Sequence, residues 1–248
     1  MAKIKLNEIS LSYLLEDGLA KNNHTCLILH GWGANKEFMK DIFLKQVKNN
    51  FEKIIFLDLP GFGNSNEPLK SFDSFECLDI VVEFLNKINL NINCILGHSY
   101  GAKLAALYAS KYKLDKLILI ASAGIVLKKS FKTRLKIKIS KCLKMLKINK
   151  NPFISKDAIN LSKVMYESFK RVVDEDFSSY FSSISSKTLI LWGKEDDATK
   201  LQAGKILHSL IKNSYFFEFS GNHFFFIQND TTLIIKDFLN DELNNKTF

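Results

Sequence analysis

Short apolar runs alternate with longer amphipathic segments along most of the chain. Runs with the character of buried strands cover residues 25–29, 53–57, 93–96, 116–121, 188–192 and 215–219. Ahead of them, segments 3–8 and 11–15 have the pattern of an antiparallel pair. Helical periodicity covers residues 72–88, 100–112 and 231–239. Because helices between apolar strands are typical of a parallel sheet covered on both faces, we expect an α/β fold whose mostly parallel sheet has about eight strands.

One interval between predicted strands is much longer than the others. A crossover between parallel strands needs only about a dozen residues, yet the predicted strands at 116–121 and 188–192 are much farther apart. Helical patterns at 127–146 and 156–173 occupy most of this interval. We therefore expect a core formed by 1–121 and 188–248, with 122–187 inserted as a helical cap over the site.

Residues 97–101 read Gly-His-Ser-Tyr-Gly, a G-x-S-x-G pattern between an apolar strand and a helix-forming segment. A serine on so sharp a strand-to-helix turn holds its hydroxyl clear of the backbone, and the flanking glycines relieve the crowding there. The five letters alone are a weak signal, but their place between strand and helix predicts a nucleophile elbow. Ser99 is therefore the candidate nucleophile.

A serine hydroxyl needs a general base, an orienting acid and hydrogen-bond donors for an oxyanion. The run Glu195-Asp196-Asp197 follows one predicted strand, and His223 follows the last one. Serine, acid and histidine in this chain order, each just after a strand, are typical of α/β-hydrolases. An earlier turn, His30-Gly31-Trp32-Gly33, can place the backbone N–H of Trp32 beside that of Tyr100, the residue after Ser99.

With these pieces in place, nearly the whole chain resembles the α/β-hydrolase superfamily. The motifs in family order are His30-Gly31-Trp32-Gly33, Asp58-Leu59-Pro60-Gly61-Phe62-Gly63-Asn64-Ser65, the elbow, Trp192-Gly193-Lys194-Glu195-Asp196 and Gly221-Asn222-His223. The His-Gly-Trp-Gly form is similar to the small carboxylesterase branch. Lys200, Asn222 and Gln228 depart from the usual family residues, at positions without chemistry in the triad.

The resemblance implies an α/β-hydrolase fold with a helical cap, a Ser99-His223-Asp196 triad and an oxyanion hole made by the N–H groups of Trp32 and Tyr100. The family spacing places the acid three residues after the glycine that ends the strand. That spacing selects Asp196 and leaves Asp197 as the alternative.

These residues predict a serine hydrolase that cleaves an ester or a thioester through an acyl-enzyme. A carbon–carbon bond hydrolase of the same fold stays open as an alternative, because that branch keeps the same triad. A non-catalytic ligand-binding protein, or a carrier- or membrane-docking protein, is the alternative from another class. Ser99 argues against the dehalogenases and epoxide hydrolases of this fold, which use aspartate as nucleophile.

The composition, 46% hydrophobic and 25% charged residues, is that of a soluble globular protein. No apolar stretch approaches the length of a transmembrane helix, and the N-terminus lacks a signal-peptide pattern, so we expect a cytoplasmic location. The four cysteines are scattered without ligand spacing and are expected to be reduced packing thiols. We expect neither a cofactor nor a metal, because clustered ligands and a phosphate-binding glycine loop are both missing from the sequence.

Positive charge is concentrated in the predicted cap. Eleven lysine and arginine residues occur from Lys128 to Lys156 without an intervening acid, which exceeds the net charge of +9 of the whole chain. Apolar residues recur at helical spacing among them, so the segment is a basic amphipathic helix. Two interpretations stay open: a cap helix with solvated lysines, or a docking surface for an acidic carrier protein or an anionic membrane. We expect no nucleic acid, because no recognition motif accompanies the charge.

Overall fold

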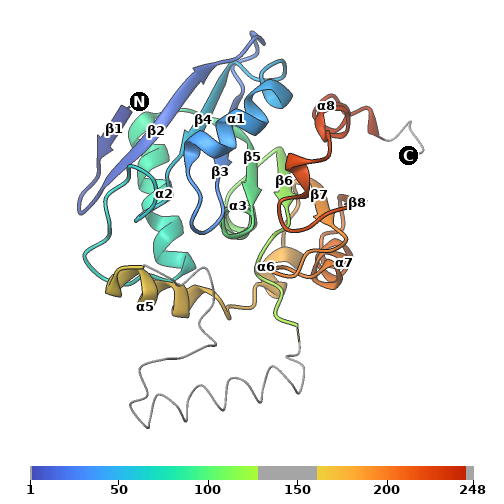
Figure 1. The fold of residues 1–248 in the computed structure, drawn as a ribbon. Helices are drawn as coiled ribbons and strands as arrows, with labels where there is room; N and C mark the ends of the chain where they lie inside the picture. The colour runs from blue at the N-terminus through green and yellow to red at the C-terminus, as the bar shows by residue number, and fades with distance from the viewer. Residues whose placement is uncertain (1, 128–160, 244–248) are drawn as a thin grey trace.

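The computed structural model describes residues 2–127 and 161–243, which form an eight-stranded sheet with helices on both faces (Figure 1). The strands lie in the order β1-β2-β4-β3-β5-β6-β7-β8. Their bounds are β1 Ala2–Lys5, β2 Ser10–Asp17, β3 Thr25–Leu29, β4 Lys53–Leu57, β5 Ile92–His98, β6 Lys116–Ile120, β7 Lys187–Gly193 and β8 Ser214–Phe219. Strand β2 pairs antiparallel with β1 and β4, and every other neighbouring pair is parallel. The predicted mostly parallel sheet is confirmed.

Helices cover the two faces of the sheet separately. Their bounds are α1 Lys36–Val47, α2 Ser74–Ile88, α3 Tyr100–Lys111, α5 Lys163–Val172, α6 Ser178–Ser182, α7 Leu201–Leu210 and α8 Thr232–Leu239, with a short 3-10 helix at Phe225–Ile227. Side chains of α1 and α8 share one apolar cluster with Ile28 of β3, whereas those of α2, α3 and α7 share the other with Leu27 and Leu29. Alternate residues of one strand thus enter opposite cores, because successive side chains in a strand point to opposite faces.

The hydrophobic pattern of the sequence did not predict the helices α1 and α7. In α1 the apolar residues extend around much of the helix, and only three of them, Met39, Phe43 and Val47, are fully buried. Helix α7 contains Gly204, where a Cβ atom would lie 2.6 Å from the Trp192 ring. The glycine lowers helix propensity but lets α7 pack closely on β7, so tertiary packing decides this helix.

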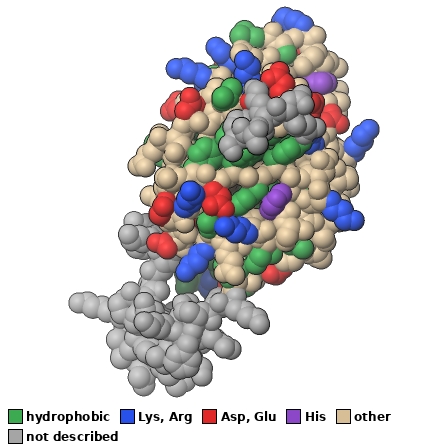
Figure 2. Space-filling model, turned by 90° about the vertical axis from the view of Figure 1, so that its right-hand side faces the viewer, with side chains coloured by type: hydrophobic (Ala, Val, Ile, Leu, Met, Phe, Trp, Pro, Cys, Tyr) green, Lys and Arg blue, Asp and Glu red, His purple; other side chains and the backbone are tan. Residues whose placement is uncertain are grey.

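Half of the predicted cap, including the basic segment from Lys128 to Lys156, lies outside the described residues, and the division into core and cap stays a prediction. Within 122–187 the structure describes α5 and α6, and Phe181 of α6 enters the same apolar cluster as α3. On the described surface, charged side chains of both signs are interspersed with apolar ones (Figure 2). None of the described helices has the length and apolar character needed to cross a membrane.

A buried ion pair fixes the turn after β4. The Lys36 ammonium lies 2.6 Å from Asp58 Oδ2, and neither side chain is exposed to solvent. The Asp58 carboxylate also accepts the backbone N–H groups of Lys36 at 2.8 Å and Asn64 at 2.8 Å. Burial alone would lower the pKa of Lys36, but its hydrogen bonds to Asp58 and Glu37 outweigh burial and raise it. Asp58 is therefore a structural residue, as its Pro-Gly-Phe-Gly sequel predicts.

We expect Asp58→Ala to destabilise the protein by about 3 kcal/mol, because the buried Lys36 ammonium, the buried Lys36 N–H and the part-buried Asn64 N–H all lose the Asp58 acceptor. Urea unfolding monitored by circular dichroism measures the loss. Asp17→Ala is the matched control, since it removes the partner of Lys53 from an exposed pair whose aspartate side chain is 81% accessible. Equal unfolding midpoints for the two variants would contradict the structural role of Asp58.

Candidate active site

Ser99 lies on the turn between β5 and α3 in a strained backbone conformation, with φ 53° and ψ −112°. Its N–H donates to the Ile120 carbonyl at 2.9 Å, and its own carbonyl accepts from Lys103 and Ala123, both at 3.1 Å. Hydrogen bonds to the end of the neighbouring strand β6, to the loop after it and to α3 therefore hold this backbone. Such strain is rare for a residue with a side chain and is concentrated at functional sites.

Two glycines permit the turn for packing reasons. A Cβ atom on Gly97 would lie 2.5 Å from the Ala102 Cα, where α3 returns against β5. A Cβ atom on Gly101 would lie 2.4 Å from the His30 carbonyl oxygen. Both distances are too short for any side chain, so the elbow pattern predicted from residues 97–101 is required by the close approach of three backbone segments.

His223 is paired with Asp196. Its Nδ1 lies 2.7 Å from Asp196 Oδ2, and the aspartate side chain is fully buried. The other oxygen, Oδ1, accepts the backbone N–H groups of Ala198 at 2.8 Å and Thr199 at 2.9 Å. Asp197 is exposed. The structure thus brings Asp196, and not the alternative Asp197, to the imidazole.

Thr199 is a further polar residue of the site that the sequence analysis does not identify. Its hydroxyl lies 2.8 Å from Asp196 Oδ2, 3.3 Å from His223 Nδ1 and 3.1 Å from the Ala121 carbonyl. The Trp192 indole N–H donates to the Thr199 carbonyl at 2.7 Å. The only sequence signal for this role of Thr199 is its place three positions after the predicted acid. Hydroxyl residues are common at such positions in turns, so the signal is weak.

The loops that carry Ser99 and His223 meet through the residue before the serine. His98 Nε2 lies 3.2 Å from the His223 carbonyl, and the centroids of the two imidazole rings are 4.7 Å apart. The two loops that carry the predicted nucleophile and base therefore meet, although 124 positions separate Ser99 and His223 in the sequence.

The predicted oxyanion donors come from two places: Trp32 lies on the adjoining turn after β3, and Tyr100 begins α3. A Cβ atom on Gly31 would lie 3.1 Å from the Ser99 Cβ, so the backbone before Trp32 passes directly against the serine. Tyr100 is the first residue of α3, and its N–H therefore has no acceptor within the helix. The backbone before Trp32 and the start of α3 thus both adjoin Ser99, and the role of the two N–H groups as an oxyanion hole stays a prediction.

His30 holds the turn in place. Its Nδ1 lies 2.7 Å from the Gly31 carbonyl, which can only accept, while Nε2 accepts the Leu59 N–H at 2.9 Å. One nitrogen donates and the other accepts, so the ring is neutral. Burial lowers the pKa of His30, in agreement with this assignment. His30 therefore supports this loop and has no acid–base role assigned to it.

An apolar wall lies beside the serine. The Trp32 ring packs against Phe62, Tyr100 and Phe169, with ring centroids 4.8, 5.3 and 5.5 Å away. Phe169 belongs to α5, so this helix closes one side of the site. Aromatic residues in this arrangement favour an apolar group of a ligand over a charged one.

A buried lysine fixes α5 against the elbow helix. Lys103, one turn after Ser99, donates to the Val172 carbonyl at 2.6 Å and to Glu175 Oε2 at 2.8 Å. Glu175 also accepts the hydroxyl of Ser74 at 2.5 Å, at the start of α2. Burial lowers the pKa of Lys103 although Glu175 opposes that shift. The network joins three elements, two of which carry residues of the apolar wall.

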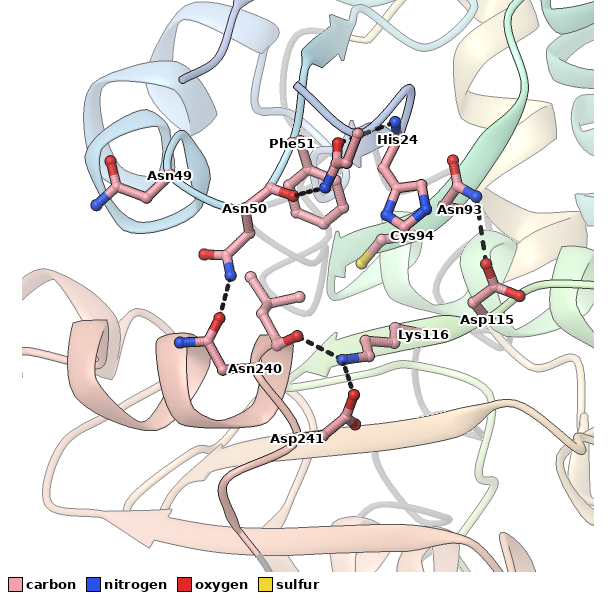
Figure 3. A pocket seen from close by; sticks show the side chains of 12 residues that line it. His24, Asn49, Asn50, Phe51, Asn93, Cys94, Asp115, Lys116, Asn240 and Asp241 are labelled. Atoms are coloured by element: carbon pink, nitrogen blue, oxygen red, sulfur yellow. Dashed lines mark hydrogen bonds and ion pairs between the residues drawn. The ribbon is translucent and has the colours of Figure 1, made fainter. Parts of the chain in front are cut away.

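A polar cavity of about 410 Å³ lies at the other edge of the sheet, where β5 and β6 begin (Figure 3). The polar side chains in it pair with one another: Lys116 with Asp241 at 2.9 Å, and Asn93 with Asp115 at 3.2 Å. Ser99 follows the opposite end of β5. Because ligands of open α/β sheets bind at the carboxyl ends of the strands, this cavity is not the candidate site.

Cys26, Cys77 and Cys94 are buried free thiols, and Cys142 lies outside the described residues. Burial raises the pKa of Cys77 to about 12, which keeps it a neutral packing group. Within residues 2–127 and 161–243, no three histidine, cysteine or acidic side chains are grouped so that they could hold a metal ion.

Known protein sequences resemble parts of this chain, and one relative matches most of it. The family model described as alpha/beta hydrolase fold matches residues 26–140. The uncharacterized hydrolase YugF of Bacillus subtilis (strain 168) is 24% identical over 225 residues, which cover 77% of this chain and 79% of that protein. The chain covers only 25 to 37% of the length of the first curated relatives that it matches.

Solved structures resemble the whole fold. A bacterial membrane phospholipase A, described as a virulence factor, superposes with a TM-score of 0.76 at 22% identity, covering 98% of this chain and 86% of that one. A thermophilic esterase from Thermogutta terrifontis superposes with a TM-score of 0.70 at 18% identity, covering 98% and 99%. At such identities the likeness shows the fold alone, and the predicted α/β-hydrolase fold is confirmed.

The strain at Ser99 predicts an unusual order of stabilities. Ser99→Gly relieves a backbone conformation that costs about 1–3 kcal/mol for a residue with a Cβ, whereas Ser99→Ala keeps it. Both variants lose the hydroxyl, so their difference isolates the backbone. We expect Ser99→Gly to unfold at a higher urea concentration than Ser99→Ala. Its free energy of unfolding should be larger by about 1 kcal/mol, after subtraction of the entropy that glycine adds to the unfolded chain. An alanine variant as stable as the glycine variant would contradict strain at this position.

Proposed function

We propose that this chain, which has the α/β-hydrolase fold, is a serine hydrolase of the α/β-hydrolase superfamily that cleaves an ester or thioester through Ser99, His223 and Asp196. One observation carries the proposal: a buried carboxylate lies 2.7 Å from His223 Nδ1, and that imidazole lies beside the loop of a strained serine. A strained turn, a base and an orienting acid in one place are what acyl transfer by a serine requires.

The reaction follows from the roles of these groups. His223 Nε2 takes the proton of the Ser99 hydroxyl as the oxygen attacks the acyl carbonyl. Asp196 accepts the Nδ1–H, which keeps Nε2 free as the base and stabilises the imidazolium that forms. The N–H groups of Trp32 and Tyr100 bind the oxyanion of the tetrahedral intermediate. His223 then returns the proton to the leaving alcohol or thiol, and water releases the acyl group from the serine by the same steps.

The surroundings of Asp196 support its role as the acid. Three donors besides His223 surround the carboxylate, namely the N–H groups of Ala198 and Thr199 and the Thr199 hydroxyl. Hydrogen bonds to the charged form favour an ionised carboxylate. A buried negative charge next to His223 is what stabilises the imidazolium during the reaction.

The apolar wall supports an uncharged acyl or alcohol group in the substrate. Trp32 supplies a proposed oxyanion donor from its backbone and an aromatic face from its side chain, and Phe169 packs on that face. Hydrolysis of p-nitrophenyl esters of increasing acyl length tests both turnover and the size of the apolar site. The specificity constant is expected to rise with acyl length until the apolar wall is covered.

Ser99→Ala is expected to abolish this hydrolysis, because loss of the nucleophile of such a triad costs on the order of 10⁶ in kcat. A fluorophosphonate probe should label the wild-type protein at Ser99 and leave the variant unlabelled. Circular dichroism establishes that the variant is folded. Labelling of a folded Ser99→Ala protein would place the nucleophile elsewhere.

Asp196→Asn is expected to lower kcat by about 10⁴, because an amide at this position favours the wrong imidazole tautomer. Asp197→Asn is the matched control, since it makes the same chemical change one residue away at an exposed position. We expect its kcat to stay within about twofold of wild type. The reverse ranking of the two variants would assign the acid to Asp197.

A further inference from the structure

His98 lies where three loops of the site meet. It ends β5 immediately before Ser99, and only 1% of its surface is exposed. Its Nε2 lies 3.2 Å from the His223 carbonyl oxygen, and its Nδ1 would lie 2.8 Å from a Cβ atom on Gly31. The His98 ring thus contacts the backbone of the proposed base and the turn of the proposed oxyanion hole. His98 is also the residue directly before the proposed nucleophile in the chain.

The contacts of the ring define its protonation. A carbonyl oxygen only accepts, so His98 Nε2 carries the hydrogen and donates it to His223. Nδ1 is buried without a hydrogen-bond partner among the described residues, and the Gly31 backbone packs against it. A proton there would be buried without an acceptor. Burial, and after it the charge of His223, hold the pKa of His98 well below its usual range.

Aromatic side chains hold the ring in this orientation. The centroids of Phe226 and Phe224 lie 4.9 and 5.2 Å from that of His98, and both residues follow His223 in the chain. The ring therefore cannot turn its Nε2 away from the carbonyl without displacing the segment that carries the base.

We propose that His98 is a positioning residue that sets the distance between Ser99 and His223, through its Nε2–H bond to the His223 carbonyl. This inference rests on the proposed function of the triad. Asp196 holds His223 by its side chain and His98 holds it by its backbone, so the imidazole is fixed at two points. The second of these contacts comes from His98, the residue next to Ser99. A shift of the Ser99 turn would therefore move His223 with it.

The neutral state of His98 is part of this role. His223 becomes an imidazolium when it takes the serine proton, and a second cation 4.7 Å away would oppose that step. A neutral Nε2–H donor provides the hydrogen bond without the charge. A lysine or arginine at this position could donate the same bond but would add the repulsion.

The test compares His98→Phe with His98→Gln in the full-length protein. Phenylalanine keeps an aromatic ring between Phe224 and Phe226 but has no donor, whereas the glutamine side-chain amide offers an N–H near the position of Nε2. With a p-nitrophenyl ester that wild type hydrolyses, we expect His98→Phe to lower kcat by about 10–100-fold with KM changed less than about twofold, as misplacement by about 1 Å does. His98→Gln should keep kcat within about fivefold of wild type. Thermal unfolding establishes that both variants are folded.

A second measurement uses the wild-type protein alone. Nitrogen-15 NMR of the imidazole rings should show His98 as the neutral Nε2–H tautomer from about pH 8 down to about pH 5, around the usual histidine pKa. A His98 ring that titrates in this interval, or carries its hydrogen on Nδ1, would overturn the proposal even if both variants failed to fold.

The outcomes separate this proposal from the one on which it rests. A folded His98→Phe protein with wild-type kcat, or equal losses in the phenylalanine and glutamine variants, contradicts the positioning role and leaves the serine hydrolase standing. Wild-type protein that hydrolyses no ester, and that a fluorophosphonate does not label, contradicts the proposed function instead.

Discussion

The close approach of three backbone segments around Ser99 is the constraint on which the site depends. Strand β5 must turn into α3 within one residue, while the end of β3 passes against the same turn. Gly97 and Gly101 make this possible, since side chains there would overlap the backbone of Ala102 and of His30. The result is a serine at φ 53°, held by hydrogen bonds from both sides. Packing of the sheet and α3 maintains the strain, so the fold itself keeps this residue in a conformation that it would not adopt alone.

The residues around this turn follow the carboxyl ends of neighbouring parallel strands. Asp196 and His223 come after β7 and β8, and the turn with Trp32 comes after β3. Parallel strands deliver their ends to one edge of the sheet, so short loops suffice to bring distant residues together. The buried polar groups of these loops are held as neutral rings or paired charges. His30 and His98 are uncharged, and the buried Lys36 and Asp58 neutralise each other.

One side of the site depends on a long-range ion pair instead of a loop. Lys103 on α3 holds Glu175 and the end of α5, which places Phe169 against Trp32. Because breaking a buried pair leaves an uncompensated charge, such a pair fixes one arrangement more firmly than apolar contact does. Helix α5, which carries Phe169, and the elbow helix α3 therefore share a common support, although residues 128–160 lie between them in the chain.

The sequence by itself determined the succession of strands and helices typical of an α/β fold, the elbow at Ser99 and the histidine after β8, because periodicity and glycine spacing are local signals. The family spacing favoured Asp196 as the acid and left Asp197 open, and only the tertiary structure decided which carboxylate meets His223. Asp196 and Asp197 are chemically the same, and the choice depends on which one the turn after β7 buries. Thr199, His98 and Lys103 are also defined by partners distant in the chain, between 24 and 125 positions away. Contacts of that kind arise from packing and leave no periodic trace in the sequence.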